Sequence, residues 1–122
     1  MQRKTFLSSA LALALGTIAS APALAQDNWP SKNIRFVVPY PPGGPTDLMA
    51  RLLQGELSKR LGVAVVVDNK GGAGGNLGAE VVAKSAGDGY TLLMGTVGTH
   101  GINRALYAKL PYDPFKDFVP IS

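Results

Sequence analysis

The sequence predicts an α/β fold in which a parallel sheet is flanked by helices. Short apolar runs rich in β-branched residues alternate with longer segments of helical periodicity, three times in succession. Each apolar run is followed by a loop rich in glycine or proline. Parallel strands joined by right-handed crossovers have their carboxyl ends at one edge of the sheet, where such sheets bind ligands. The three loops are therefore expected to converge.

The first strand is expected at residues 34–38, a short apolar run. A helix should begin at about Thr46 and end before Gly62, because glycine suits the left-handed position that follows a helix. Leucine and methionine recur every three or four residues along this helix, which predicts the face that packs on the sheet. This apolar row consists of Met49, Leu53, Leu57 and Leu61, with Leu48 and Leu52 beside it.

The later elements follow the same alternation. The expected ranges are 63–67 for the second strand, 76–85 for the second helix, 90–94 for the third strand and up to about 108 for a third helical segment. Residues 110–118 are expected to form an extended connector, and residues 119–122 resemble the beginning of a strand.

The loop after the first strand combines stiff prolines with flexible glycines. Gly43 and Gly44 allow a ligand to approach the backbone, and the next helix directs its unpaired N–H groups into the same space. A small carboxylate would suit this loop. The alternative is a structural turn in which Thr46 or Asp47 caps the helix. Tyr40 is interpreted as a wall of the pocket, with loop packing as its alternative role.

The other two loops offer further polar groups. The glycine-rich loop at 71–78 is interpreted as presenting backbone amides to an anion. Asn76 can cap the second helix, donate to a ligand, or do both. In the third loop, Thr96 and Thr99 are either caps or hydroxyl donors. His100, the only histidine, is more typical of a hydrogen-bonding loop residue than of a catalytic one.

Several classes of site are excluded by the sequence. The glycine loop does not fit the dinucleotide fingerprint, since Leu77 stands where its last glycine belongs, and no Walker A loop or G-x-S-x-G motif is present. A single histidine excludes a multi-histidine metal site, and the absence of cysteine excludes disulfides, cysteine-bound zinc and a thiol nucleophile. No basic run suggests a nucleic-acid partner.

Residues 1–25 are predicted to be an export signal. Arg3 and Lys4 form its basic start, residues 6–18 its apolar core, and Ala23-Leu24-Ala25 a cleavage site before Gln26. Removing two basic residues leaves ten against eight acids, a net charge of about +2. The mature protein is expected to be periplasmic and, without a cysteine at the cleavage point, not a lipoprotein. The route stays open between general and twin-arginine export.

Four ordered motifs together resemble one known family. They are the segments 35–47, 69–78, 88–93 and 110–118, which read RFVVPYPPGGPTD, NKGGAGGNLG, DGYTLL and LPYDPFKDF. This combination resembles the Bug (TctC-like) extracytoplasmic solute receptors of tripartite tricarboxylate transporters. The resemblance implies a two-lobed, type II-like periplasmic binding protein, of which residues 26–122 would be the N-terminal part of lobe 1, with the chain truncated before lobe 2.

The resemblance also implies a function. Such receptors close on a small carboxylate, namely a di- or tricarboxylate, an acidic amino acid or an aromatic acid, and deliver it to a membrane permease or, in some members, signal to a sensor kinase. No catalysis and no cofactor are expected. The loops implied to hold the carboxylate contain Tyr40, Gly43, Gly44, Thr46, Asp47, Gly74, Gly75, Asn76, Thr96, Thr99 and His100.

One consequence and two alternatives stay open. A chain lacking half of the cleft is expected to bind its ligand weakly or not at all. One alternative is a periplasmic hydrolase-like enzyme that uses Asp47 and His100. The other is a sensory ligand-binding module that contacts a kinase.

Overall fold

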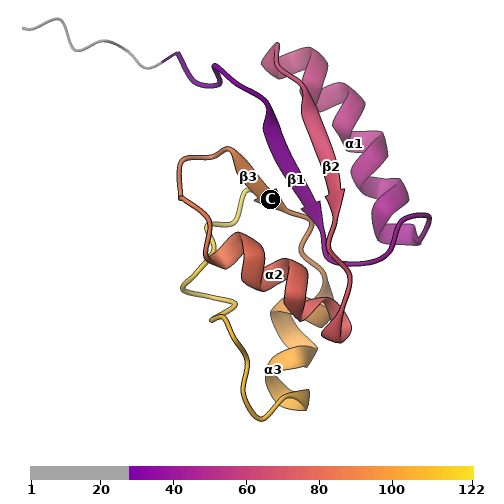
Figure 1. The fold of residues 1–122 in the computed structure, drawn as a ribbon, viewed down its shortest axis with the longest axis vertical. Coiled ribbons are helices and arrows are strands. Elements are labelled where there is room, and N and C mark those ends of the chain that lie inside the picture. The colour runs from indigo at the N-terminus through magenta and orange to yellow at the C-terminus, as the bar shows by residue number, and fades with distance from the viewer. Residues whose placement is uncertain (1–27) are drawn as a thin grey trace, which may run out of the picture.

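The computed structural model describes residues 28–122, and the predicted export signal lies outside them. Three parallel strands form one sheet in the spatial order β2-β1-β3. Their bounds are Ile34–Val38 for β1, Val65–Asn69 for β2 and Thr91–Leu93 for β3. The predicted parallel sheet with flanking helices is confirmed (Figure 1).

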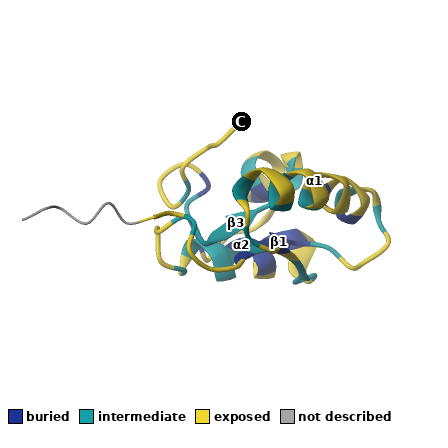
Figure 2. Ribbon diagram, turned by 90° about the horizontal axis from the view of Figure 1, so that it is seen from above, coloured by how far each residue is buried: buried dark blue, intermediate teal, exposed yellow. Residues whose placement is uncertain are grey.

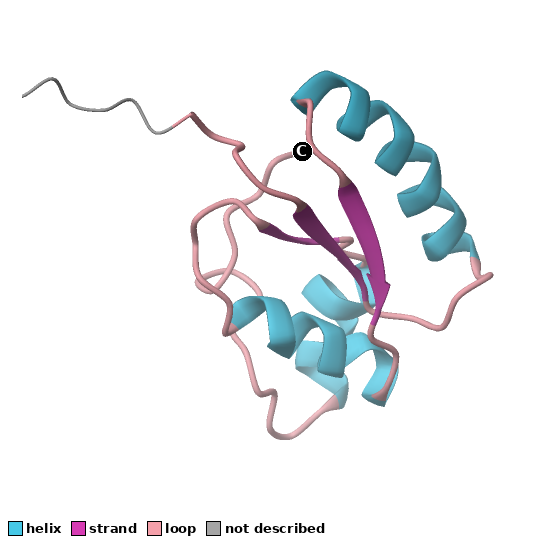
Figure 3. Cartoon of the chain, turned by 45° about the horizontal axis from the view of Figure 1, so that its top comes forward, coloured by secondary structure: helices cyan, strands magenta, loops and turns pink. Residues whose placement is uncertain are grey.

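Three α-helices accompany the sheet. They are α1 at Pro45–Leu61, α2 at Asn76–Ala83 and α3 at Asn103–Leu106, with a 3-10 turn at Ala73–Gly75 and a π-helical turn at Gly98–Ile102. Figure 3 shows α1 on one side of the sheet and α2 on the other. Among residues 28–122, no helix is both long enough and apolar enough to cross a bilayer.

Several predicted boundaries need correction. The second strand begins at Val65 and not at residue 63, because Ser58 Oγ accepts the Val65 N–H and the Ala64 carbonyl accepts from Ile34, which together set the start of pairing. The third helical segment ends at Leu106, after a π-helical turn. Residues 119–122 are not part of a strand.

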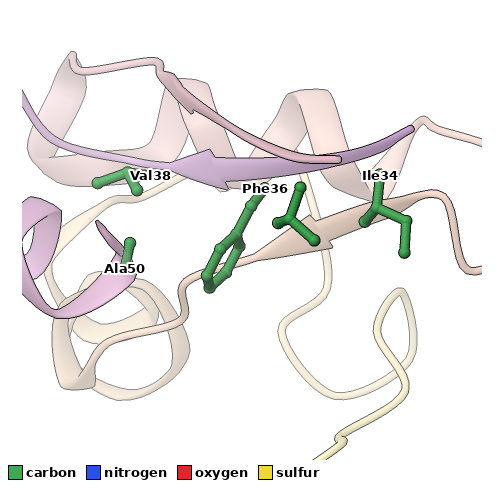
Figure 4. Close-up of a cluster of buried hydrophobic side chains, with 5 residues drawn as sticks. Ile34, Phe36, Val38 and Ala50 are labelled. Atoms are coloured by element: carbon green, nitrogen blue, oxygen red, sulfur yellow. The ribbon is translucent and has the colours of Figure 1, made fainter. Parts of the chain in front are cut away.

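The main core lies between the sheet and α1. Ile34, Phe36 and Val38 alternate along β1, so they point to one face, where they pack with Val65 and Ala50 (Figure 4). Val37 points to the opposite face and is fully buried. A strand buried on both faces explains why residues 34–38 form a continuous apolar run.

The predicted packing face of α1 is wrong in its first half. Leu48, Met49, Leu52 and Leu53 are exposed, and only Leu57 and Leu61 of the row lie against the core. Figure 2 shows this exposed outer surface of α1. Ala50 instead faces the sheet with no exposed surface, because a small side chain lets the helix approach the strands closely.

Candidate functional site

The three loops at the carboxyl ends of the strands meet at Tyr40, in the loop after β1. Its hydroxyl lies 2.9 Å from Thr96 Oγ1, in the loop after β3. A Cβ added to Gly75, in the loop after β2, would lie 3.2 Å from the same hydroxyl, and one added to Gly98 would lie 2.9 Å from it. A side chain at either glycine would therefore crowd the Tyr40 hydroxyl, and the predicted convergence of the loops is observed.

The first loop is fastened by the buried carboxylate of Asp47. Its Oδ2 accepts the Gly43 N–H at 2.9 Å and the Arg51 Nε–H at 2.9 Å, and its Oδ1 accepts from Asn69 Nδ2 at 3.0 Å. These bonds from Arg51, Gly43 and Asn69 lower the pKa of Asp47 to about 2. The carboxylate thus ties the loop to α1 and to the end of β2.

The start of α1 differs from the sequence interpretation. Gly44 is the N-cap residue and Pro45 begins the helix, so neither Thr46 nor Asp47 occupies the cap position. Gly44 is extended there, and its lack of a side-chain oxygen leaves no side-chain cap. By position, the N–H groups of Thr46 and Asp47 have no acceptor within the helix, which leaves donors beside the loop.

The second loop depends on left-handed glycine. Gly74 and Gly75 have φ angles of 65° and 93°, which side chains rarely adopt. Asn76 follows as the first residue of α2 and is buried. Its Oδ1 accepts from Asn103 Nδ2 at 2.7 Å, so the side chain is used inside the protein and does not cap the helix.

The third loop forms a compact hydroxyl cluster. Thr99, with no exposed surface, accepts the Thr96 N–H at 3.0 Å, and its Oγ1 lies 2.8 Å from His100 Nδ1. Partial burial lowers the pKa of His100, which favours the neutral ring at pH 7. The ring also packs edge-on against Phe118, with centroids 4.9 Å apart.

Two residues of this region were missed from the sequence. Asn103 lies in α3, and its Nδ2 also donates to the Gly74 carbonyl at 2.9 Å. Tyr112 is buried, and its hydroxyl donates to the Thr99 carbonyl at 2.7 Å. The only sequence signal concerned Tyr112, an aromatic residue in a proline-flanked connector, and it does not reveal the hydrogen-bond partner of the hydroxyl.

The arrangement suits binding better than hydrolysis. Asp47 and His100 belong to separate hydrogen-bond networks, so no acid–base pair joins them. The hydroxyl of Thr99 is buried and therefore unsuited to attack a substrate. Backbone N–H groups and uncharged hydroxyls remain, and these stabilise an anion without a counter-charge.

A separate hollow lies away from these loops. It has a volume of about 380 Å³ and is lined by Arg104, Leu110, Pro111, Tyr112, Asp113 and Pro114. Because it shares only Tyr112 with the buried network around Asn76, we treat it as a surface feature of the connector.

Comparisons with known proteins agree on one class. Residues 49–122 match the family described as tripartite tricarboxylate transporter family receptor. Protein BugT of Bordetella pertussis (strain Tohama I) is 40% identical over 119 residues, which cover 97% of this chain and 36% of BugT. The chain spans about a third of the length of the curated relatives that it matches.

Two solved structures share the fold. MatC from Rhodopseudomonas palustris with bound malate has a TM-score of 0.73 and 49% identity, covering 75% of this chain and 31% of MatC. The periplasmic binding protein BugD has a TM-score of 0.69 and 39% identity, covering 76% of this chain and 31% of BugD.

The fold is thus that of solute-binding proteins. This class comprises α/β proteins that present loops at the carboxyl edge of a parallel sheet. Within it, the chain belongs to the tripartite tricarboxylate transporter receptor family, also known as TctC or Bug.

Proposed function

We propose that this chain contributes part of the binding site of an extracytoplasmic receptor for a small carboxylate. The observation that carries the proposal is the meeting of three loops at Tyr40, where hydroxyl groups and helix N–H groups lie at one edge of the sheet. Family membership and the malate bound to MatC support the ligand class. A di- or tricarboxylate, an acidic amino acid or an aromatic acid all fit this chemistry.

The site residues have different roles in this proposal. Tyr40 and Thr96 form its centre, and the N–H groups of Thr46 and Asp47 at the start of α1 donate to carboxylate oxygens. Gly43 and Gly75 shape the loops, because their own N–H groups already donate to Asp47 and to the Gly72 carbonyl. The other predicted residues, Gly44, Asp47, Gly74, Asn76, Thr99 and His100, lie in or beside the same loops. Asp47 acts by holding the first loop in place, because its two oxygens already accept three hydrogen bonds.

The family name suggests the partner of the receptor. We propose that the receptor delivers its carboxylate to the permease subunits of a tripartite tricarboxylate transporter, after export and cleavage behind Ala25. Catalysis forms no part of this proposal, since the loops offer binding groups without an activated nucleophile.

The proposal is tested with a chimera in which residues 28–122 replace the matching segment of MatC. Isothermal titration with malate, succinate, citrate and glutamate should give saturable binding of at least one of them. Acetamide, which lacks a carboxylate, serves as the uncharged control. A folded chimera that binds none of these acids, while MatC binds malate under the same conditions, would contradict the proposal.

A second titration uses the 122-residue chain itself. The amide signals of Gly43, Thr46 and Gly75 are followed by NMR as malate is added. We expect shifts confined to the three loops, even where affinity is weak. Shifts spread evenly over the surface would indicate nonspecific association instead.

A further inference from the structure

The connector after α3 folds into a turn, which we call the C-terminal strap and define as residues 112–118. Two acids fasten it. Asp113 Oδ1 accepts from the N–H groups of Phe115 and Lys116 at 2.9 and 3.1 Å, and Asp117 Oδ2 accepts from the Asp113 N–H at 2.7 Å. This brings Tyr112 and Phe118 together, with ring centroids 5.8 Å apart and nearly perpendicular.

The strap reaches two of the three site loops. The single hydroxyl hydrogen of Tyr112 is shared between the Thr99 carbonyl at 2.7 Å and Asn76 Oδ1 at 3.1 Å. Phe118 packs edge-on against His100. The strap therefore bridges the third loop and the start of α2 from the protein interior.

These bonds determine the orientation of the Asn76 amide. The same atom of Asn103 contacts the Gly74 carbonyl and the Asn76 side chain. Because a carbonyl can only accept, this atom must be the Nδ2 of Asn103, which donates one hydrogen to Gly74. The Asn76 atom that receives its other hydrogen must then be Oδ1. The Tyr112 hydroxyl, which can donate as well as accept, is compatible with this orientation.

The Asn76 Nδ2 consequently keeps its hydrogens for another acceptor. Asn76 is only 4% exposed, yet this nitrogen donates to no group within residues 28–122. Within that range, no fully buried side-chain nitrogen or oxygen lacks a hydrogen-bond partner. Because this nitrogen has no such partner, it must retain contact with solvent. A nearly buried donor oriented by two bonds on its other atom is prepared for a ligand.

We propose that Tyr112 and Asn103 are positioning residues that hold the Asn76 amide with its Nδ2 toward the bound ligand, where it donates to a carboxylate oxygen. The inference rests on the proposed function and adds to it a donor and the pair of residues that orient that donor. Asn76 touches the ligand in this scheme, whereas Tyr112 and Asn103 act only through it.

The test uses the MatC chimera with malate as the probe. Tyr112→Phe removes the orienting hydroxyl and keeps the ring against Phe118, and we expect a loss of affinity of about five- to tenfold. Tyr90→Phe is the matched control, because its hydroxyl bonds Ser31 at the opposite edge of the sheet. Val65→Ala destabilises the core at that same opposite edge, so it separates loss of stability from loss of affinity. Both controls should bind malate as the parent does.

Asn76→Asp examines the donor directly. The variant keeps an oxygen for Asn103 and Tyr112 but replaces the donor by a charged oxygen, so malate binding should be lost. In the parent, the side-chain NH₂ signals of Asn76 should shift when malate is added. In Tyr112→Phe, those signals should differ from the parent even without ligand, whereas in Tyr90→Phe they should not.

The outcomes separate this inference from the proposed function. The inference would be overturned if Tyr112→Phe bound malate as tightly as the parent, or if the NH₂ signals of Asn76 did not shift when malate binds. Either result would leave the proposed carboxylate binding intact. A folded chimera without malate binding would count against malate capture. The positioning role is then judged from the NH₂ signals of Asn76 without ligand. If these signals are the same in Tyr112→Phe and in the parent, the positioning role is overturned.

Discussion

The hydroxyl oxygens of Tyr40 and Thr96 lie 2.9 Å apart and join the loops after β1 and β3, which are 56 residues apart in the chain. Thr96 Oγ1 also accepts the Thr99 N–H at 3.3 Å. The shape of the third loop is therefore linked to the position of a single side chain in the first.

This link is measurable by a double-mutant cycle. Tyr40→Phe and Thr96→Val each remove one hydroxyl, and we expect a coupling free energy of about 1 kcal/mol from urea unfolding. Both single variants should also weaken malate binding in the MatC chimera. Additive effects on the free energy of unfolding would mean that the two hydroxyls do not depend on each other.

The glycine beside Tyr40 provides a second prediction. Gly75→Ala would place its Cβ 2.9 Å from Thr99 Cγ2, at a φ of 93° that alanine rarely adopts. We expect a loss of about 1–3 kcal/mol in the free energy of unfolding. Gly87→Ala is the control, since nothing lies within 4 Å of its added Cβ, and its effect should stay within about 0.5 kcal/mol. Equal effects of the two substitutions would contradict the requirement for glycine at 75.

From the lowered pKa of Asp47 we predict that the free energy of unfolding declines at acid pH. Its pKa is lowered from 3.8 to about 2 in the folded protein, so the unfolded chain binds the proton more readily. The contribution to the free energy of unfolding is then complete above about pH 5 and is lost as the pH falls from about 4 toward 2. The same direction holds for Asp113, whose pKa is lowered by the backbone N–H groups of Phe115 and Lys116.

Urea unfolding at pH 7, 5, 4, 3 and 2.5 measures this decline in the free energy of unfolding. Asp47→Asn should lower stability at pH 7 and flatten the decline at acid pH. Glu56→Gln, an exposed acid paired only with Lys59, is the control and should leave the curve unchanged. A parallel curve for Asp47→Asn would show that another group causes the decline.

The sequence predicted those parts of the fold that depend on local pattern. The run at residues 34–38 and the alternation of strands and helices are local, and the meeting of Tyr40 with the other loops follows from parallel topology. The bonds of Asn103 and Tyr112 could not be predicted, because they join segments 27 and 36 residues from Asn76 through packing alone. The roles of the site residues in binding stay a prediction.

The misjudged face of α1 leads to the last prediction. Periodicity placed Leu53 on the packing face with Leu52 beside it, but these side chains are 44% and 71% exposed, while Ala50 has no exposed surface. The leucine row shows that a helical stripe is apolar without showing which part of it meets the sheet.

Leu52→Lys should change the free energy of unfolding by no more than about 0.5 kcal/mol. Ala50→Leu should cost about 1–3 kcal/mol, because the larger side chain would push α1 away from Phe36 and Val38. Urea unfolding of both variants measures the difference, and a larger loss for Leu52→Lys than for Ala50→Leu would reverse the assignment of the helix face.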